Sequence, residues 1–532
     1  MFDLEDLRGA GVDIPQKEKE EIIQNTQECP QWVHFGGGNL CRAFHAEVAQ
    51  TLIDQGVFET GIIVCETFDE EIIDLVYTPY QQEILEVIMH EKGHFEQKLL
   101  QSTAASYFCH PARDESYQAV RDIFKNHTLQ LVTVTITEKG YGLTTSTGAY
   151  LKSVEQDIVA GPHAATHTMS ILTSLIWDRF QSNAAPLALV STDNFSQNGQ
   201  RFEKAILTIA TEWCMKGHVT QAFVDYLNDK ETISFPWSMI DRITPNPSQV
   251  VLDQLTESGI EGLSLIRTKK GTNIAPFANT ESTHYLVIED NFPNGRPDLA
   301  KGGVILTSRE VVDKADIMKV TTCLNPLHTA MSIFGCLLGF ETIADEMADQ
   351  DIRRLVEGIG YDEGLPVVED PGIIQPKTFI DEVVRLRLPN PLIPDTPQRI
   401  ATDTSQKMAI RFGETIKKNV EKEQVDALQF IPLAIAGWLR YLLAIDDEGQ
   451  SFEPSPDPLL SELQSQLAAI KLGEAMDTAS YIQPILSNET LFGLDLYQAG
   501  LACKVQTYFE QMLTGTGAVR HTLHETVGGL QE

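Results

Sequence analysis

The sequence predicts an α/β chain in two parts: a doubly wound, Rossmann-type domain with additions over residues 1–306, and a mainly α-helical domain over residues 307–532. Residues 31–66 have the pattern strand, glycine turn, helix, strand. Short apolar runs then alternate with helical patterns, and beyond residue 307 one helical pattern follows another. A length of 532 residues also favours more than one hydrophobic core.

The first βαβ unit is the most legible segment. Residues 31–35 are suited to a buried strand, residues 42–53 carry apolar side chains three and four apart, and residues 61–66 form a second apolar run. Glycines between the strand and the helix let a dinucleotide pyrophosphate approach the backbone at the positive end of the helix. A tight turn without a ligand is the alternative. The predicted cofactor residues of this turn are Gly36, Gly37, Gly38, Asn39 and Leu40.

Two details of the unit bear on the cofactor. Cys41 stands where the third glycine of G-x-G-x-x-G is usual, so the helix must pack differently there. Glu66 ends the second strand, where a carboxylate accepts hydrogen bonds from the ribose hydroxyls and repels a 2′-phosphate. This arrangement favours NAD over NADP, although Asp69 could take the same role and an ordinary solvated acid is nearly as well supported.

Further elements follow at regular intervals. Polar residues 191–194 come directly after one strand, at the end where open sheets bind ligands, and Asn194 could donate its amide to a substrate oxygen or form an Asx turn. The expected strands are 131–136, 187–190, 263–266 and 285–288, and the expected helices are 117–125, 168–180 and 199–216.

Residues 319–328 carry the most informative part of the helical half. Pro326 inside a continuous helix would cost about 3 kcal/mol, so we expect one helix to end near Leu324 and another to start at Pro326, capped by Asn325. On one straight helix, Lys319 and His328 would lie on opposite faces, and the break would bring them toward one cavity. Lys319 is a candidate proton acceptor, and a surface lysine is the alternative.

Asp241 and Arg242 stand side by side in an apolar, proline-bounded stretch. Unpaired charge is expensive in such surroundings, so the two residues need a ligand or partners within the protein. Substrate binding and a structural ion pair are equally supported.

Composition excludes several classes of function. Forty Lys and Arg residues against 75 Asp and Glu residues give a net charge of −35, which repels nucleic acid and anionic membrane surfaces. The eight cysteines are scattered singly, and the first fifteen residues lack the pattern of a signal peptide. We therefore expect a cytoplasmic protein without a metal site, which acts on a small molecule as a monomer or small homo-oligomer.

Taken in order, several segments resemble the polyol-specific long-chain dehydrogenase family, which contains mannitol dehydrogenases and the mannonate/fructuronate and altronate/tagaturonate oxidoreductases. The resemblance covers about residues 31–412. It rests on residues 36–45 (GGGNLCRAFH), 135–141 (TITEKGY), 191–194 (STDN) with Asn198 and Gly199, 241–245 (DRITP), 319–328 (KVTTCLNPLH) and 387–391 (RLPNP).

The resemblance implies a metal-independent secondary-alcohol dehydrogenase that uses NAD. Lys319 would be the general base, and Asn194 and Asn325 would hold the substrate oxygen. One departure is that five residues separate Lys319 from Asn325, where the family usually has four. Either a bulge absorbs the extra residue or the base is another lysine, for which Lys269, Lys270 and Lys407 are the spare candidates.

Glu138 and Lys139 before a Gly-Tyr pair, and Asn325 before Pro-Leu-His, look more like the sugar-acid members than the mannitol enzymes. The resemblance thus favours interconversion of D-mannonate and D-fructuronate, with altronate/tagaturonate, mannitol or arabinitol as alternatives, and a non-catalytic NAD(H) sensor as an alternative of another class. Glu138 would lie on the cofactor side. The residues expected to bind or orient the substrate are Asp241, Arg242, His328, Arg387 and Lys139.

Overall fold

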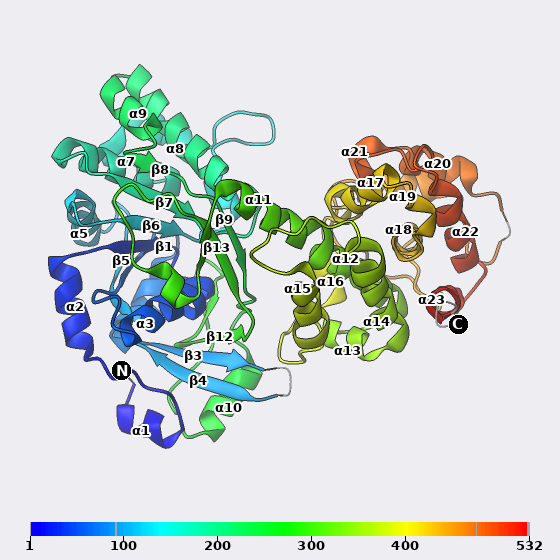
Figure 1. Cartoon of the computed structure of the whole chain (residues 1–532), viewed down its shortest axis with the longest axis horizontal. Coiled ribbons are helices and arrows are strands. Elements are labelled where there is room, and N and C mark those ends of the chain that lie inside the picture. The colour runs from blue at the N-terminus through cyan, green and yellow to red at the C-terminus, as the bar shows by residue number, and fades with distance from the viewer. Residues whose placement is uncertain (1, 91–92, 475, 529–532) are drawn as a thin grey trace. The chain divides into compact units, whose positions relative to one another are not determined.

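The computed structural model describes residues 2–90, 93–474 and 476–528 (Figure 1). Contacts within the chain divide it into two compact units. Unit 1 consists of Met1–His90 and His94–Asp313, and unit 2 consists of Glu91–Gly93 and Lys314–Glu532. The predicted border at 306/307 lies in β14 (Ile305–Thr307), and the division between the units falls within the next helix, α11 (Arg309–Met318).

Unit 1 is built on a six-stranded parallel sheet whose strand order is β5-β2-β1-β6-β7-β8. Numbered along the chain within this sheet, the order is 3-2-1-4-5-6, which is that of dinucleotide-binding Rossmann domains. The predicted fold class is therefore confirmed. The strands are β1 (Trp32–Phe35), β2 (Ile62–Glu66), β5 (Thr103–Phe108), β6 (Leu131–Val134), β7 (Leu187–Ser191) and β8 (Ile233–Ser234).

Helices cover both faces of this sheet, which explains why β1, β2, β6 and β7 are buried along their whole length (Figure 1). Alternate residues of β1 enter different cores: Val33 and Phe35 pack with residues of α5, α7 and α8, whereas Trp32 packs with residues of α3. The covering helices are α3 (Ala46–Asp54), α5 (Asp114–Lys125), α7 (Thr168–Ser182) and α8 (Asn198–Met215).

Three small sheets are added to unit 1. They are β12-β3-β4, β14-β13-β9 and the two-stranded hairpin β10-β11. Their strands are β3 (Ile84–Met89), β4 (Phe95–Leu100), β9 (Ser238–Asp241), β10 (Ile266–Arg267), β11 (Asn273–Ile274), β12 (Phe277–Glu281) and β13 (Tyr285–Glu289). The remaining helical segments are α1 (Leu4–Gly9), α2 (Lys19–Glu28), α4 (Glu70–Ile72), η2 (Ile73–Tyr77), η3 (Thr78–Tyr80), η4 (Glu138–Tyr141), α6 (Lys152–Ala160), η5 (Pro162–Ala164), α9 (Gln221–Asn228), α10 (Gln249–Glu257) and η6 (Leu299–Gly302).

The N-terminal segment, for which the sequence offers no role, protects the edge of β4. Asp13 forms a parallel bridge with Lys98: its amide donates to the Gln97 carbonyl at 2.9 Å, and its own carbonyl accepts from the Leu99 amide at 2.8 Å. An open strand edge is a template for aggregation, so this pairing satisfies the backbone groups that β4 would otherwise expose.

The strand expected over 263–266 is wrong, because only Ile266 and Arg267 pair, as β10. Strands β3, β4, β5, β8, β9, β11, β12 and β14 are additional to those expected. Several of them mix polar and apolar residues or are only two or three residues long, as in β4 (FEQKLL) and β12 (FANTE), so no continuous apolar run marks them.

Unit 2 is helical, with two buried helices at its centre. These are α12 (Asn325–Leu338) and α18 (Phe430–Leu442), and both are strongly apolar. The surrounding segments are η7 (Lys319–Cys323), α13 (Ile343–Ala348), α14 (Gln350–Glu357), η8 (Gly358–Gly364), α15 (Pro376–Glu382), η9 (Val383–Arg387), α16 (Pro397–Ile400), η10 (Thr404–Gln406), η11 (Ala409–Gly413), α17 (Glu414–Glu421), η12 (Val425–Ala427), α19 (Leu460–Leu467), α20 (Ala479–Leu486), α21 (Glu489–Phe492), α22 (Ala502–Met512) and α23 (Ala518–Gly528). Across the described ranges, no helix combines the length and apolarity needed to span a bilayer.

Candidate active site

The turn after β1 requires glycine at its first position. Gly36 has a φ of +107°, and a Cβ atom there would lie 2.0 Å from the carbonyl oxygen of Thr135. Its amide donates to the Cys65 carbonyl at 2.8 Å, which fixes the turn between β1 and β2. A Cβ at Gly38 would meet nothing within 4 Å. The turn is thus closely packed at Gly36 and has open space at Gly38.

The helix that follows begins irregularly, as the replacement of the third glycine predicts. Residues Cys41–His45 form a π-helical turn before α3. Cys41 is fully buried, with its Sγ 4.0 Å from the hydroxyl of Tyr77, and that hydroxyl donates to the Gly37 carbonyl at 3.1 Å. The larger side chain is therefore accommodated by a widened turn and a contact with η2.

Glu66 ends β2 and supports the glycine turn. Its Oε2 accepts from the Gly37 amide at 3.0 Å, and its Oε1 accepts from the amides of Thr67 and Phe68 at 2.9 Å each. Burial raises the pKa of this carboxyl, and the amide donors oppose that effect. Because a carboxylate oxygen accepts two hydrogen bonds, Oε2 can still receive a ribose hydroxyl.

Asp69, the alternative ribose acceptor, is committed elsewhere. Its Oδ2 accepts from the hydroxyls of Thr268 and Thr272, both at 2.6 Å, and the residue is buried. This carboxylate therefore anchors the β10-β11 hairpin, which leaves Glu66 as the acid that faces the glycine turn.

A buried polar network lies behind the turn. The ring nitrogens of His34 lie 2.7 and 2.8 Å from the hydroxyls of Thr133 and Thr135, and Nε2 of His45 lies 2.8 Å from the hydroxyl of Thr192. The two imidazole rings are 4.3 Å apart. Burial lowers the pKa of His45 from 6.5 to about 4 and that of His34 well below its usual value.

The network predicts a stability that depends on pH. Because the pKa of His45 is lower in the folded state, the unfolded chain binds the proton first, so stability present above pH 6.5 is lost as the pH falls toward 4. We expect His45 alone to account for a loss of about 3 kcal/mol in the free energy of unfolding across that interval. Urea unfolding of wild type and of His45→Asn at pH 7, 6 and 5 measures this loss. If the free energy of unfolding changes equally with pH in the two proteins, the prediction is contradicted.

Asp193 organises the carboxyl ends of β6 and β7, although the sequence drew attention to its neighbour. Its carboxylate accepts from the amides of Ile136 and Thr137 at 2.9 Å each, and from the Tyr141 hydroxyl at 2.7 Å. Asn194 follows in an exposed position. The sequence signal for Asp193 is a carboxylate at the end of a buried strand. The sequence analysis instead selected Asn194, because its amide can donate a hydrogen bond to a substrate oxygen.

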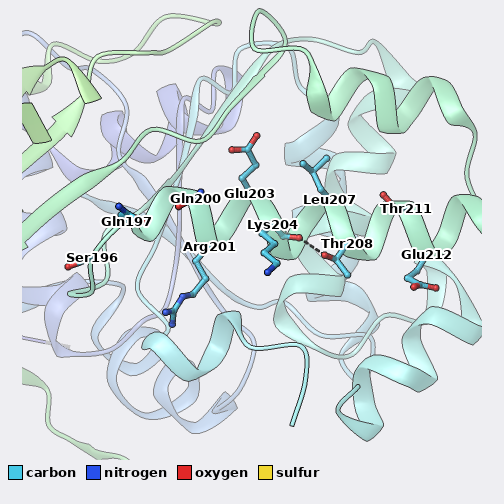
Figure 2. A pocket seen from close by; sticks show the side chains of 10 residues that line it. All are labelled: Ser196, Gln197, Gln200, Arg201, Glu203, Lys204, Leu207, Thr208, Thr211 and Glu212. Atoms are coloured by element: carbon cyan, nitrogen blue, oxygen red, sulfur yellow. Dashed lines mark hydrogen bonds between the residues drawn. The ribbon is translucent and has the colours of Figure 1, made fainter. Parts of the chain in front are cut away.

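Glu138 and Lys139 lie in η4, beyond the end of β6, and both are exposed. Glu138 forms an ion pair with Arg201 of α8. Arg201 and neighbouring residues of α8 line a hollow of about 790 Å³ (Figure 2). Ser196, which also lines this hollow, is two residues after Asn194 in the sequence.

Asp241 ends β9 and is buried, and its neighbour Arg242 is engaged inside unit 1. The guanidinium of Arg242 pairs with Glu47, lies 3.5 Å from a carboxylate oxygen of Glu86, and donates to the Glu281 carbonyl at 3.2 Å. The structural ion pair is therefore the better interpretation of Arg242, and we do not place it in the substrate site.

In unit 2, Lys319 begins the π-helical turn η7 and is 1 % exposed, with its Nζ 3.6 Å from Oδ1 of Asp316. A π turn contains one residue more than the α-helical turn it replaces. Such a turn can accommodate the extra residue between Lys319 and Asn325 that the bulge hypothesis requires.

The predicted break in the helix is confirmed at Leu324, whose φ and ψ of −132° and −63° separate η7 from α12. The predicted cap is wrong: Leu324 occupies the N-cap position, and no side chain caps the helix. Asn325 and Pro326 are its first two residues, so the side chain of Asn325 is not used as a cap. Asn325 and His328 are both half-buried on the first turn of α12.

Two further cationic residues of unit 2 are candidates for the site: Arg387 as a substrate-binding residue and Lys407 as an alternative base. Arg387 is buried at the end of η9. Lys407 is half-buried and donates to the Thr402 carbonyl, and burial, together with the nearby Arg411 guanidinium, lowers its pKa to about 8. The other spare lysines, Lys269 and Lys270, are exposed in unit 1 and less suited to act as a base.

His90 and His94 match the spacing H-E-x-x-H, but zinc proteases place that motif on a helix. Here the two residues close the connection between β3 and β4, where the His90 amide donates to the His94 carbonyl at 2.9 Å. In the parts of the chain that the structure describes, no group of three or more His, Cys, Asp or Glu side chains could hold a metal ion.

Comparisons with known proteins agree with this architecture. Residues 30–301 match the Rossmann domain of mannitol dehydrogenase and residues 312–513 its C-terminal domain. The chain is 49% identical over 522 residues to the D-mannonate oxidoreductase of Thermotoga maritima, covering 97% of this chain and 96% of that one.

Two solved structures share the whole fold. A substrate-free D-sorbitol dehydrogenase superposes with a TM-score of 0.78 at 23% identity, covering 96% of this chain and 97% of that one. The mannitol 2-dehydrogenase of Pseudomonas fluorescens, in a ternary complex with NAD and D-mannitol, superposes with a TM-score of 0.69 at 22% identity, covering 98% and 96%. With both family domains matched in order along the chain, this protein belongs to the mannitol dehydrogenase family.

Proposed function

We propose that the chain is an NAD-dependent oxidoreductase that interconverts D-mannonate and D-fructuronate. The relationship to D-mannonate oxidoreductase, 49% identical over nearly the full length of both chains, supports the substrate. The structural observation that carries the chemistry is Lys319, an amine almost completely shielded from water at a π-helical turn that precedes Asn325 and His328.

The residues of unit 1 fit a dinucleotide. Gly38 leaves open space where a pyrophosphate can approach the backbone, and the helix that starts there directs its positive end to that space. Glu66 retains a lone pair for a ribose hydroxyl beside the same turn. Gly36, Gly37, Gly38, Asn39, Leu40 and Glu66 would hold the cofactor, with Glu138 at the rim.

When bound, the nicotinamide accepts or donates the hydride. The alcohol proton must leave as the C–H bond breaks, and Lys319 would accept it. Asp316, 3.6 Å away, would orient the amine. Burial of both side chains excludes bulk water from the proton that is transferred.

The other site residues would bind and orient the substrate. As the family resemblance implies, the amides of Asn194 and Asn325 would stabilise the negative charge that develops on the reacting oxygen, an effect of about 2.7–4 kcal/mol for one such donor. His328 and Asp241 would hold neighbouring hydroxyls. The carboxylate of a hexonate needs a local cation in a protein of net charge −35, and Arg387 would supply it, with Lys139 as a weaker candidate.

The test is the formation or consumption of NADH, measured by absorbance, with mannonate, altronate, mannitol and arabinitol in one direction and fructuronate and tagaturonate in the other. We expect the highest kcat/KM for mannonate and fructuronate. A preference for another pair would assign the chain to that member of the family. Tight NADH binding without turnover of any substrate would contradict the proposal and favour a nucleotide sensor.

A further inference from the structure

The hairpin β10-β11 is attached to the end of β2. Its tip, Thr268–Thr272, is held by the two threonine hydroxyls that donate to Asp69. The amide of Lys269 donates to Glu71 at 2.7 Å, and its ammonium lies 2.7 Å from the same carboxylate. Three side chains thus fasten the tip onto residues that follow the last residue of β2.

This attachment places Lys270 over Phe68, two residues beyond Glu66. The Lys270 ammonium donates to the Phe68 carbonyl at 2.6 Å and lies 4.4 Å from the centre of the Phe68 ring. Phe68 is 62% exposed, so a ligand can reach its ring. A cation and an aromatic face therefore stand together at the carboxyl end of β2.

Most charged side chains near the end of β2 already have partners within the protein. Glu66 is 6% exposed and accepts hydrogen bonds from four backbone amides. Asp69 accepts from two threonine hydroxyls, and Glu71 is paired with Lys269. Within the described residues, Lys270 makes no ion pair with a carboxylate, and its one hydrogen-bond acceptor is a carbonyl. Lys270 is therefore a cation at the end of β2 whose charge is not already paired with a carboxylate of the described residues.

We infer that Lys270 and Phe68 form a subsite for an adenosine 2′-phosphate, so that the chain accepts NADP(H) as well as NAD(H). The inference rests on the proposed function, because it concerns the same cofactor site. In dinucleotide-binding domains, the end of this strand meets the 2′-oxygen of the adenosine ribose, and a basic residue nearby accommodates the phosphate of NADP. The expectation that Glu66 favours NAD over NADP is thereby modified.

Both cofactors are accommodated for separate reasons. The remaining lone pair on Oε2 of Glu66 can accept a 2′-hydroxyl, which suits NAD. A 2′-phosphate carries more negative charge, and the Lys270 ammonium offsets its repulsion by Glu66 through a charge-assisted hydrogen bond. Phe68 offers a flat apolar face for the adenine on the side that the ammonium leaves uncovered.

The experiment measures the dissociation constants of NADH and NADPH by nucleotide fluorescence for wild type, Lys270→Met and Lys269→Met. Methionine keeps the apolar stem over the Phe68 ring and removes the charge. We expect wild type to bind both nucleotides, Lys270→Met to weaken NADPH binding at least tenfold, and NADH binding to change less than twofold. Lys269→Met is the comparison from the same tip: it also removes one positive charge but leaves Lys270 on Phe68, and it should change the ratio of the two constants less than Lys270→Met does.

The outcomes separate this inference from the proposed function. Wild type that binds and turns over NADH with fructuronate but does not bind NADPH would overturn the inference and leave the proposed function intact. Equal weakening of both nucleotides by Lys270→Met would also overturn it, because it would assign Lys270 to general support of the hairpin. Failure to bind or use either nucleotide would contradict the proposed function itself. Stronger dependence of NADPH binding than of NADH binding on salt, lost in Lys270→Met, would support the inference independently.

Discussion

Lys319→Met should lower kcat for mannonate oxidation by about 10²–10⁴-fold, the usual contribution of a positioned general base. Methionine has nearly the same length and fills the buried position, so the fold of unit 2 should survive. NADH binding should not change, because the glycine turn and Glu66 belong to unit 1. Steady-state turnover and nucleotide fluorescence on the same preparation measure the two effects.

Two lysines serve as comparisons for this variant. Lys314 lies on the preceding helix, paired with Glu369 at 2.9 Å, and Lys314→Met should leave kcat within twofold of wild type. Lys407 has a pKa lowered to about 8 and is the other candidate for the base. If Lys407→Met abolishes turnover and removes the pH dependence of kcat while Lys319→Met keeps both, the base is Lys407 and the assignment of Lys319 is wrong.

Gly36→Ala should unfold or strongly destabilise unit 1, by about 3 kcal/mol or more. The backbone there has a φ of +107°, and the new methyl group would lie 2.0 Å from the Thr135 carbonyl oxygen. Gly36 follows β1 and Thr135 follows β6, so the two residues cannot move apart without disrupting the pairing of these strands. Urea unfolding followed by tryptophan fluorescence measures the change. A free energy of unfolding within 1 kcal/mol of wild type would contradict the turn geometry.

Gly38→Ala is the matched substitution in the same turn. The new methyl group would meet no protein atom within 4 Å, so stability should stay close to that of wild type. The same methyl group would project into the space that the pyrophosphate needs, so NADH should bind at least tenfold more weakly. Unchanged NADH affinity would show that the dinucleotide does not approach Gly38.

Sequence alone located the residues whose chemistry or conformation is hard to replace. The glycine turn was recognisable because glycine is needed where the backbone has a positive φ or a ligand comes close. Lys319, Asn325 and His328 were recognisable from their order in the chain, and the break at Leu324 followed from the cost of a proline within a helix. The position of Asp193 was visible, but its role was not, because that role consists of hydrogen bonds to Ile136 and Thr137, far away in sequence.

The sequence by itself determined the fold class, the family and the identity of the candidate residues, because periodicity, turn glycines and motif order are local properties of the chain. The tertiary structure decided which partners the charged side chains have. It committed Arg242 to Glu47 and Asp69 to the hairpin threonines, and it widened the helix at Lys319 into a π turn that can accommodate one extra residue. Hydrogen bonds and ion pairs between distant segments depend on which surfaces meet when the chain folds, and no local pattern of residues specifies that.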